Sequence, residues 1–241
     1  MYTFRRAKRK VMTMLKGIDI SSHQGNIDLY PLQDVDFVIV KATEGLSYVN
    51  PYCDTKYSQA RGLGKCVGFY HFAGENNARA EAEYFCDNCY GYFGNGIPVL
   101  DWEGNQSVEW VNEFVRYVHE RTGVWCWIYG NPWRFNQGGV EPNCARWVAS
   151  YPNVIRPGLD FDPGQTPVVD GLVAAWQYAS DGYVIGYDGN LDISEFYGDH
   201  NTWAAYTGGN VEITPPPNPE EVGAEWTTLE NAQYTIKILQ K

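Results

Sequence analysis

The sequence lacks an apolar run long enough to cross a membrane, which excludes a transmembrane helix. Basic residues are also scarce, with 18 Lys and Arg against 29 Asp and Glu. Six of the 18 lie within residues 1–16, so the rest of the chain has 12 basic and 29 acidic residues, a balance of −17. Such a body repels nucleic acid and anionic membrane surfaces, and we expect neither as a partner.

The beginning of the chain lacks the apolar core of a secretory signal. Residues 1–15 form a basic leader, but only the short stretch Val11–Leu15 is apolar, and it runs directly into Lys16. A signal peptide needs an apolar segment of roughly 7–15 residues after its basic start. We therefore expect residues 1–15 to be a disordered leader and the protein to be made in a bacterial cytoplasm without a signal peptide.

Cysteine is too sparse for a disulfide framework. The chain has six cysteines among 241 residues, and most lie within apolar runs, where a buried free thiol is the usual state. Cys86 and Cys89 form the one close pair, with no second pair and no His nearby, whereas a structural zinc needs four ligands. We therefore expect neither a metal nor a cofactor.

Eight apolar runs predict strands, and several of them end in polar or aromatic residues. Helical patterns lie between the early runs, two of them behind an Asn or Ser cap. The predicted strands are Lys16–Ser21, Phe37–Val40, Cys66–Phe69, Pro98–Leu100, Val124–Ile128, Ala145–Ala149, Leu172–Ala175 and Asn190–Ser194, and the predicted helices are Tyr52–Arg61, Asn77–Tyr90 and Ser107–Thr122.

The alternation of strands and helices favours a parallel sheet, and eight such strands favour an α/β barrel with its functional groups at the carboxyl ends. The second half departs from this pattern. Residues 131–173 have little helical periodicity and much Gly and Pro, and Gly182–Asn190 is typical of a hairpin. We therefore predict an irregular TIM-like barrel whose last strands are partly antiparallel.

The stretch Asp101-Trp102-Glu103 carries the clearest chemistry. It follows the apolar run Gly96–Leu100, and side chains two apart on a strand point to the same side. Two adjacent carboxyl groups are what cleavage of a glycosidic bond requires, since one protonates the leaving oxygen and the other supports the developing positive charge. Asp19 and Asp192 lie in similar strand settings, so four acids are candidates for one site.

Aromatic residues make up 15% of the chain, which favours a sugar-binding cleft. Those at strand ends are candidate flat faces for sugar rings, whereas Trp125 and Trp127 are expected in the core. His71 is either a hydrogen-bond partner behind the site or a structural residue. The candidate sugar-contacting aromatics are Tyr70, Tyr129, Trp147, Trp176 and Tyr178.

Taken together and in order, these segments resemble glycoside hydrolase family 25, the Chalaropsis-type lysozymes. The resemblance covers about residues 16–200, and no single segment is specific by itself. The matching segments are Gly17–Ser21 with His23–Gly25, Val38–Gly45, Gly68–Phe72, Asp101–Glu103, Ile128–Gly130, Trp176–Tyr178 and Leu191–Ser194.

The resemblance implies a flattened barrel of eight strands and about five helices. It also implies cleavage of the β-1,4 bond between N-acetylmuramic acid and N-acetylglucosamine in peptidoglycan, with glycan strands as the partner. The family's catalytic acids correspond here to Glu103, Asp101, Asp19 and Asp192. Further candidate substrate contacts within the matching segments are Gln24, Lys41, Glu44 and Gln177.

Two other functions stay open at this point. A chitinase-like glycosidase usually shows a longer series of spaced acids on one strand, which residues 96–103 lack. A non-catalytic wall-binding barrel is expected to lack Asp101 or Glu103, and both are present. The oligomeric state is not indicated by the sequence.

The resemblance also bears on the organisation of the chain. Residues 16–207 are the expected catalytic barrel, 208–222 a Pro-rich linker, and 223–241 a tail or the start of a wall-binding module. Phage endolysins of this family commonly carry such a module after a linker. With a leader that lacks an apolar core, this favours a lysin that reaches the wall only after release from the cell.

Overall fold

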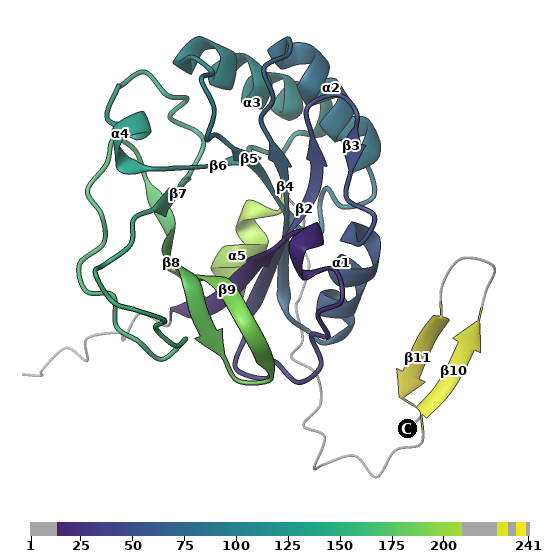
Figure 1. Cartoon of the computed structure of the whole chain (residues 1–241). Helices are drawn as coiled ribbons and strands as arrows, with labels where there is room; N and C mark the ends of the chain where they lie inside the picture. The colour runs from purple at the N-terminus through teal and green to yellow at the C-terminus, as the bar shows by residue number, and fades with distance from the viewer. Residues whose placement is uncertain (1–13, 209–225, 231–234, 240–241) are drawn as a thin grey trace, which may run out of the picture.

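The computed structural model describes residues 14–208 and two strands at 226–230 and 235–239 (Figure 1). The first half alternates strands and helices, and the second half is mostly strands and irregular connections. In chain order the elements are β1 Leu15–Ile20, η1 Ser22–Gln24, β2 Phe37–Glu44, β3 Tyr48–Val49, α1 Cys53–Gly62, β4 Cys66–Phe72, α2 Ala78–Asn88, β5 Ile97–Asp101, α3 Val108–Thr122, β6 Trp127–Gly130, α4 Pro132–Phe135, β7 Arg146–Ala149, β8 Val173–Val184, β9 Tyr187–Phe196, α5 His200–Tyr206, β10 Trp226–Glu230 and β11 Thr235–Leu239.

The strands β1, β2 and β4 to β9 close into an eight-stranded barrel, because β1 pairs both with β2 and with β9. The pairings from β1 through β2 and β4 to β8 are parallel, whereas β9 runs antiparallel to both of its neighbours. The short β3 adds an antiparallel edge to β2. The predicted irregular barrel with antiparallel last strands is therefore confirmed.

Helices α1, α2 and α3 lie together along one side of the barrel (Figure 1). The predicted caps are present, since the Asn77 side chain accepts from the Ala80 amide and the Ser107 side chain accepts from the Trp110 amide. Helix α3 ends at Gly123, whose φ of 73° is a left-handed conformation that glycine adopts without a Cβ clash. The local sequence therefore determines where these helices, which connect the parallel strands, begin and end.

The connections between β6 and β8 are irregular, as the Gly and Pro content predicted, and α4 is the only helix described there. A buried arginine organises this region in place of a helix. The Arg146 guanidinium donates to the carbonyl oxygens of four residues in the surrounding loops, so their polar groups are satisfied without regular structure. Those carbonyls belong to Val140, Glu141, Cys144 and Asp170.

The barrel interior is plugged at the amino ends of its strands by α5, which the sequence analysis did not predict. Trp203 of this helix packs against Phe37, Trp127 and Phe196, with ring centroids 4.8, 5.4 and 5.1 Å away. Its indole nitrogen donates to the Val67 carbonyl oxygen at 3.1 Å. The aromatic plug fills this end of the barrel, so a site is expected at the opposite, carboxyl end.

The expected segment boundaries fall partly outside the described residues. Of the predicted leader, Met14 and Leu15 are described, and Leu15 begins β1. The predicted linker 208–222 lies outside them except for Gly208. Within the predicted tail, β10 and β11 pair antiparallel as a separate two-stranded sheet. Among the described residues no helix is long and apolar enough to cross a membrane. All six cysteines are described, buried and unpaired.

Candidate active site

Strand alternation decides which side chains reach the barrel interior. Core residues such as Ile39, Val99 and Trp127 point inward, and every second residue after them does the same. This alternation brings polar groups from different strands together at the carboxyl end of the barrel, which is called the mouth below. The inward-facing residues at the carboxyl ends are Lys41, Tyr70, Asp101, Tyr129, Trp147 and Gln177, together with Asp19 of β1 and Asp192 of β9.

The four predicted acids are brought together by this arrangement. Asp19 and Asp192 lie directly opposite each other on the antiparallel pair β1 and β9. Asp101 ends β5 with only 6% of its surface exposed, and its carboxyl group lies within hydrogen-bonding reach of Glu103. Glu103 lies beyond the strand and is exposed. Trp102 points outward, as its place between the two acids predicted. Its indole nitrogen donates to the Gln106 carbonyl oxygen at 3.0 Å.

Burial raises the pKa of three of these carboxyl groups. The pKa of Asp101 is raised first by desolvation, then by the negative charges of Glu103 and Asp19, while Lys41 opposes the rise. The pKa of Asp19 is raised by desolvation and by Asp192, and that of Asp192 is raised to about 6, mainly by desolvation. The mouth therefore retains protons on buried carboxyl groups at pH values where exposed carboxyls have lost theirs.

One oxygen of Asp101 has no protein partner. Its Oδ1 atom is buried and accepts no hydrogen bond from the described residues. A buried carboxyl oxygen without a partner costs free energy, so such an atom in a cleft points to a group supplied by a ligand.

Gln177 links Asp19 to two tyrosines across the mouth. Its Nε2 donates to Asp19 Oδ2 at 2.8 Å, and its Oε1 accepts from the hydroxyls of Tyr129 and Tyr151 at 2.8 and 2.6 Å. The hydrogen bond from Gln177 partly offsets the effect of burial on the Asp19 pKa. Gln177 thus fixes the orientation of an acid that has little contact with solvent.

The remaining polar candidates have local partners. Lys41 Nζ forms an ion pair with Glu44 at 2.6 Å and lies 4.6 Å from the centre of the Phe72 ring. Gln24 closes a capping box at η1, where its Oε1 accepts from the Ser21 amide at 3.1 Å. Lys41 is thus placed to act on Asp101, while the observed contact of Gln24 is with the turn after β1.

Three predicted sugar-stacking rings have no open face. Trp147 points inward but is buried against Tyr129, with ring centroids 4.7 Å apart, and donates to Ser194 at 3.1 Å. Trp176 and Tyr178 flank the inward-facing Gln177, so strand alternation turns both outward into the core beneath the surrounding loops. These three positions do not fit the expected sugar contacts, whereas Tyr70 and Tyr129 face the acids.

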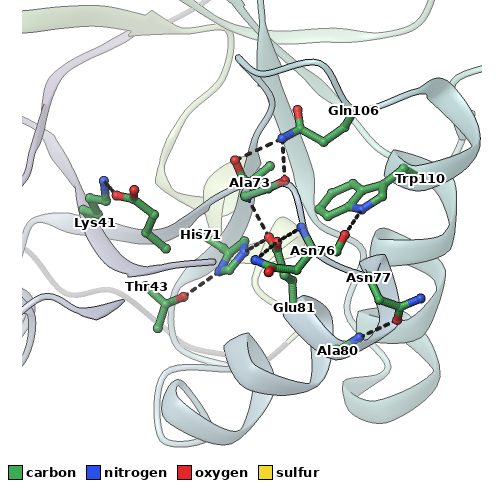
Figure 2. A network of polar contacts seen from close by, with 12 residues as sticks. Lys41, Thr43, His71, Ala73, Asn76, Asn77, Ala80, Glu81, Gln106 and Trp110 are labelled. Carbon is green, nitrogen blue, oxygen red and sulfur yellow. Dashed lines mark hydrogen bonds and ion pairs between the residues drawn. The ribbon is translucent and has the colours of Figure 1, made fainter. Parts of the chain in front are cut away.

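His71 belongs to a buried polar network behind the mouth (Figure 2). Its Nδ1 lies 2.8 Å from Thr43 Oγ1 and its Nε2 lies 3.0 Å from Glu81 Oε2. Glu81 also accepts from the amides of Gly74 and Asn76 at 2.7 and 2.9 Å, which holds the loop after β4. Burial lowers the pKa of His71, so the imidazole favours its neutral form.

This loop is also tied to the segment that carries Glu103. Gln106 Nε2 donates to the carbonyl oxygens of Ala73 and Gly74 at 3.1 and 2.6 Å (Figure 2). The Ala73 amide donates to the Asp101 carbonyl oxygen at 3.0 Å. His71 and Glu81 therefore support the site from outside the barrel, which agrees with the structural alternative for His71.

A pocket of about 200 Å³ opens beside Glu103, and several of its walls were missed by sequence reasoning. These residues follow β6 and β7 in loops, where periodicity carries no information. Asn131 followed by Pro132 is a helix-start pattern that could have indicated α4 and with it this wall. The lining residues are Trp102, Glu103, Tyr129, Asn131, Arg134, Ala149, Ser150 and Tyr151.

A second hollow, of about 320 Å³, lies between α2 and α3, is lined by residues of both charges and includes none of the four acids. The described part of the chain contains no group of three or more His, Cys, Asp or Glu side chains that could hold a metal ion.

Comparison with known proteins agrees with this geometry. Residues 18–187 match the family described as Glycosyl hydrolases family 25. The chain is 33% identical over 200 residues to an N,O-diacetylmuramidase of Chalaropsis sp, covering 73% of this chain and 93% of that protein. It is 29% identical over 236 residues to an autolytic lysozyme of Clostridium acetobutylicum, covering 94% of this chain and 66% of that protein.

The fold agrees as well. The crystal structure of a bacterial lysozyme from Streptomyces coelicolor superposes with a TM-score of 0.67 and 27% identity, covering 80% of this chain and 96% of that chain. The family match covers three of the four acids, Asp19, Asp101 and Glu103, and ends at residue 187, before Asp192 of β9. The chain belongs to glycosyl hydrolase family 25, and it is an enzyme that hydrolyses glycosidic bonds.

Proposed function

We propose that Glu103 is the general acid and Asp101 the group that stabilises the transition state when this enzyme hydrolyses peptidoglycan. Membership of family 25 gives the reaction, which is cleavage of the β-1,4 bond between N-acetylmuramic acid and N-acetylglucosamine. The observation that carries the assignment of residues is the buried, unpartnered Oδ1 of Asp101 beside the exposed Glu103.

The acid pair can hold the proton that the leaving oxygen needs. The two carboxyl groups lie within hydrogen-bonding reach, and burial with like charge keeps a proton at Asp101 to higher pH than in an exposed carboxyl group. Glu103 is the member at the pocket surface, from which a proton can pass to a glycosidic oxygen. Once Asp101 is ionised, its charge stabilises the positive charge that develops on the sugar, directly or through the N-acetyl group.

Asp19 and Asp192 support this pair and contact the sugar in the proposed complex. Asp19 adds negative charge that raises the Asp101 pKa, and Asp192 raises the Asp19 pKa in turn. Gln177, which accepts hydrogen bonds from Tyr129 and Tyr151, holds Asp19 in place. Each of the two outer acids therefore affects the pH at which the central pair works more than it affects the chemical step.

The test is mass analysis of the sugar ends released from purified peptidoglycan. We expect new reducing ends at N-acetylmuramic acid, and we expect Glu103→Gln to release none while it keeps the fluorescence spectrum of the folded protein. The exposed Glu120 offers a matched control, since Glu120→Gln changes a carboxylate near the end of the outer helix α3. New ends at N-acetylglucosamine would contradict the bond assignment, and a lytic Glu103→Gln protein would contradict the assignment of the acid.

The place of synthesis is part of the same proposal. All six thiols are buried and unpaired, which fits folding in a reducing cytoplasm followed by release through a membrane lesion. Expression alone is then expected to leave a bacterial host intact, and co-expression of a pore-forming protein to cause lysis. Lysis by the enzyme alone would contradict indirect release.

A further inference from the structure

Arg134 is the one cation among the residues that line the pocket beside Glu103. Its guanidinium lies over the Trp102 ring, 5.2 Å from the ring centre, and one terminal nitrogen donates to the carbonyl oxygen of Glu103. The side-chain stem passes over Gly130, where an added Cβ would lie 3.3 Å from Arg134 Cδ. The Trp102 ring, the Glu103 carbonyl oxygen and the space above Gly130 together hold the guanidinium at the pocket wall.

The positive charge of Arg134 is not paired within the described part of the chain. None of the ion pairs found there includes it, and its Nε is buried without a hydrogen-bond partner. Of the other polar walls, Asn131, Ser150 and Tyr151 are uncharged, and the Glu103 carboxyl group forms no ion pair with Arg134 in the structure described. Burial lowers the pKa of Arg134 and the nearby Glu103 and Asp101 raise it, and a guanidinium stays charged throughout the physiological range.

A half-buried cation that forms no direct ion pair is stabilised when a ligand supplies a negative charge in contact with it. Tethering the Glu103 carbonyl does not need a charge, since a neutral amide could donate the same hydrogen bond. A planar guanidinium with fixed donors is suited to carboxylate, which it binds through two parallel hydrogen bonds. The pocket therefore has the chemistry of a carboxylate site next to the bond that is cleaved.

We propose that Arg134 binds a carboxylate of the muramic acid side of the substrate, and so makes the enzyme prefer glycans that carry this charge. The inference rests on the proposed function, because peptidoglycan provides such groups next to the cleaved bond. Two sources share the chemistry: the lactyl carboxylate of a sugar without peptide, and the acidic residue of an attached peptide stem. Amidation of either group removes the charge and weakens binding.

The experiment compares matched substrates that differ only in this charge. Peptide-free glycan strands with free lactyl carboxylates are compared with the same strands converted to methylamides, and strands with acidic stems are compared with strands whose stems are amidated. For each pair, kcat/KM is measured for wild type, Arg134→Gln and Arg134→Lys. Arg79→Gln is the control, because Arg79 also lies over an aromatic ring, that of Tyr117 at 4.5 Å, but outside this pocket.

We expect wild type to prefer the charged member of at least one pair, and Arg134→Gln to reduce that preference about tenfold, mostly through KM, as expected for one charge-assisted contact. Arg134→Lys should restore part of it and Arg79→Gln should leave it unchanged. The substrate pair whose charged member loses its advantage in Arg134→Gln identifies the source of the carboxylate. An equal loss on charged and neutral members would show that Arg134 only tethers Glu103, and an absence of preference in wild type would also overturn the proposal.

Measurements of binding without turnover test the role of Arg134 independently of the proposed function. Calorimetry of the charged and neutral strands with Glu103→Gln, alone and combined with Arg134→Gln, measures the preference without turnover. A charge preference that disappears in the double variant supports the role of Arg134 even if the released sugar ends contradict the reaction. Equal binding of both strands to Glu103→Gln would overturn that role even if the reaction is as proposed.

Discussion

Replacing Asp192 with asparagine is expected to stabilise the folded protein at neutral pH while it weakens catalysis. Asp192 is largely buried opposite Asp19, and its pKa is raised to about 6 from the ordinary 3.8, mainly by desolvation. At pH 7 the folded protein must therefore keep a charge where a neutral group would be more stable. Asparagine has nearly the same shape, and its side-chain oxygen can keep the hydrogen bond to the backbone.

The magnitude follows from that shift. A rise of about 2 pKa units corresponds to about 3 kcal/mol of destabilisation by the ionised group. Partial exposure of the side chain and its coupling to Asp19 reduce the net gain from Asp192→Asn to about 1–2 kcal/mol, or roughly 2–8 °C in melting temperature for a domain of this size.

The pH dependence has a definite sign. Because the folded pKa lies above the unfolded one, the folded state binds more protons between pH 4 and 6, and the penalty is relieved as pH falls through that window. The stabilisation by Asp192→Asn should be full above about pH 6.5 and disappear below about pH 3.5.

Urea unfolding followed by tryptophan fluorescence at pH 7, 5 and 3.5 measures this directly. Asp188→Asn is the matched control, since Asp188 is exposed in the same β8–β9 hairpin. The reasoning is refuted if Asp192→Asn is no more stable than wild type at pH 7, or if its gain is as large at pH 3.5.

Three further outcomes are expected. Asp101→Asn should lose at least about a hundredfold in the rate of reducing-end release, because it removes a positioned charge from the transition state, and a loss below tenfold would contradict its role. Asp19→Asn should move the acid limb of the activity profile to lower pH, because the negative charge of Asp19 raises the Asp101 pKa; an unchanged profile would place Asp19 outside the site. Glu81→Gln should destabilise the fold by about 1–3 kcal/mol in thermal unfolding, since it replaces a buried carboxylate that pairs with His71 and accepts hydrogen bonds from the amides of Gly74 and Asn76, and an unchanged melting temperature would contradict this.

The sequence was sufficient to predict the barrel and the meeting of four acids at one end of it because both depend on local patterns. Apolar runs marked the strands, and the two-residue period of a strand placed Asp101 with Val99 on the inner face. The same period explains the misplaced aromatics. Gln177 points inward, so its neighbours Trp176 and Tyr178 cannot, but the sequence does not say which of three adjacent polar or aromatic residues takes the inner position.

The rest of the site depends on contacts that are distant in the chain. Arg134 reaches the pocket from the one-turn helix α4 after β6, and Tyr151 from the loop after β7, and neither segment is long enough for periodicity to indicate it. Helix α5 was also missed, because its seven residues are too short for an amphipathic pattern to be visible. Its importance comes from Trp203, which meets strands far earlier in the chain.

The two ends of the barrel interior have opposite energetic roles. At the mouth, desolvation raises the pKa values of Asp19, Asp101 and Asp192, so each ionised group there lowers the free energy of unfolding. At the other end, Trp203 and the rings around it are buried, and burial of one large apolar side chain contributes roughly 1.5–3 kcal/mol. The stabilisation from a few such buried rings is comparable with the destabilisation caused by the ionised acids at the mouth. Since the plug lies at the amino ends of the same strands, it can stabilise the barrel without contact with the mouth, and this separation allows a cluster of buried carboxyl groups to persist in a stable fold.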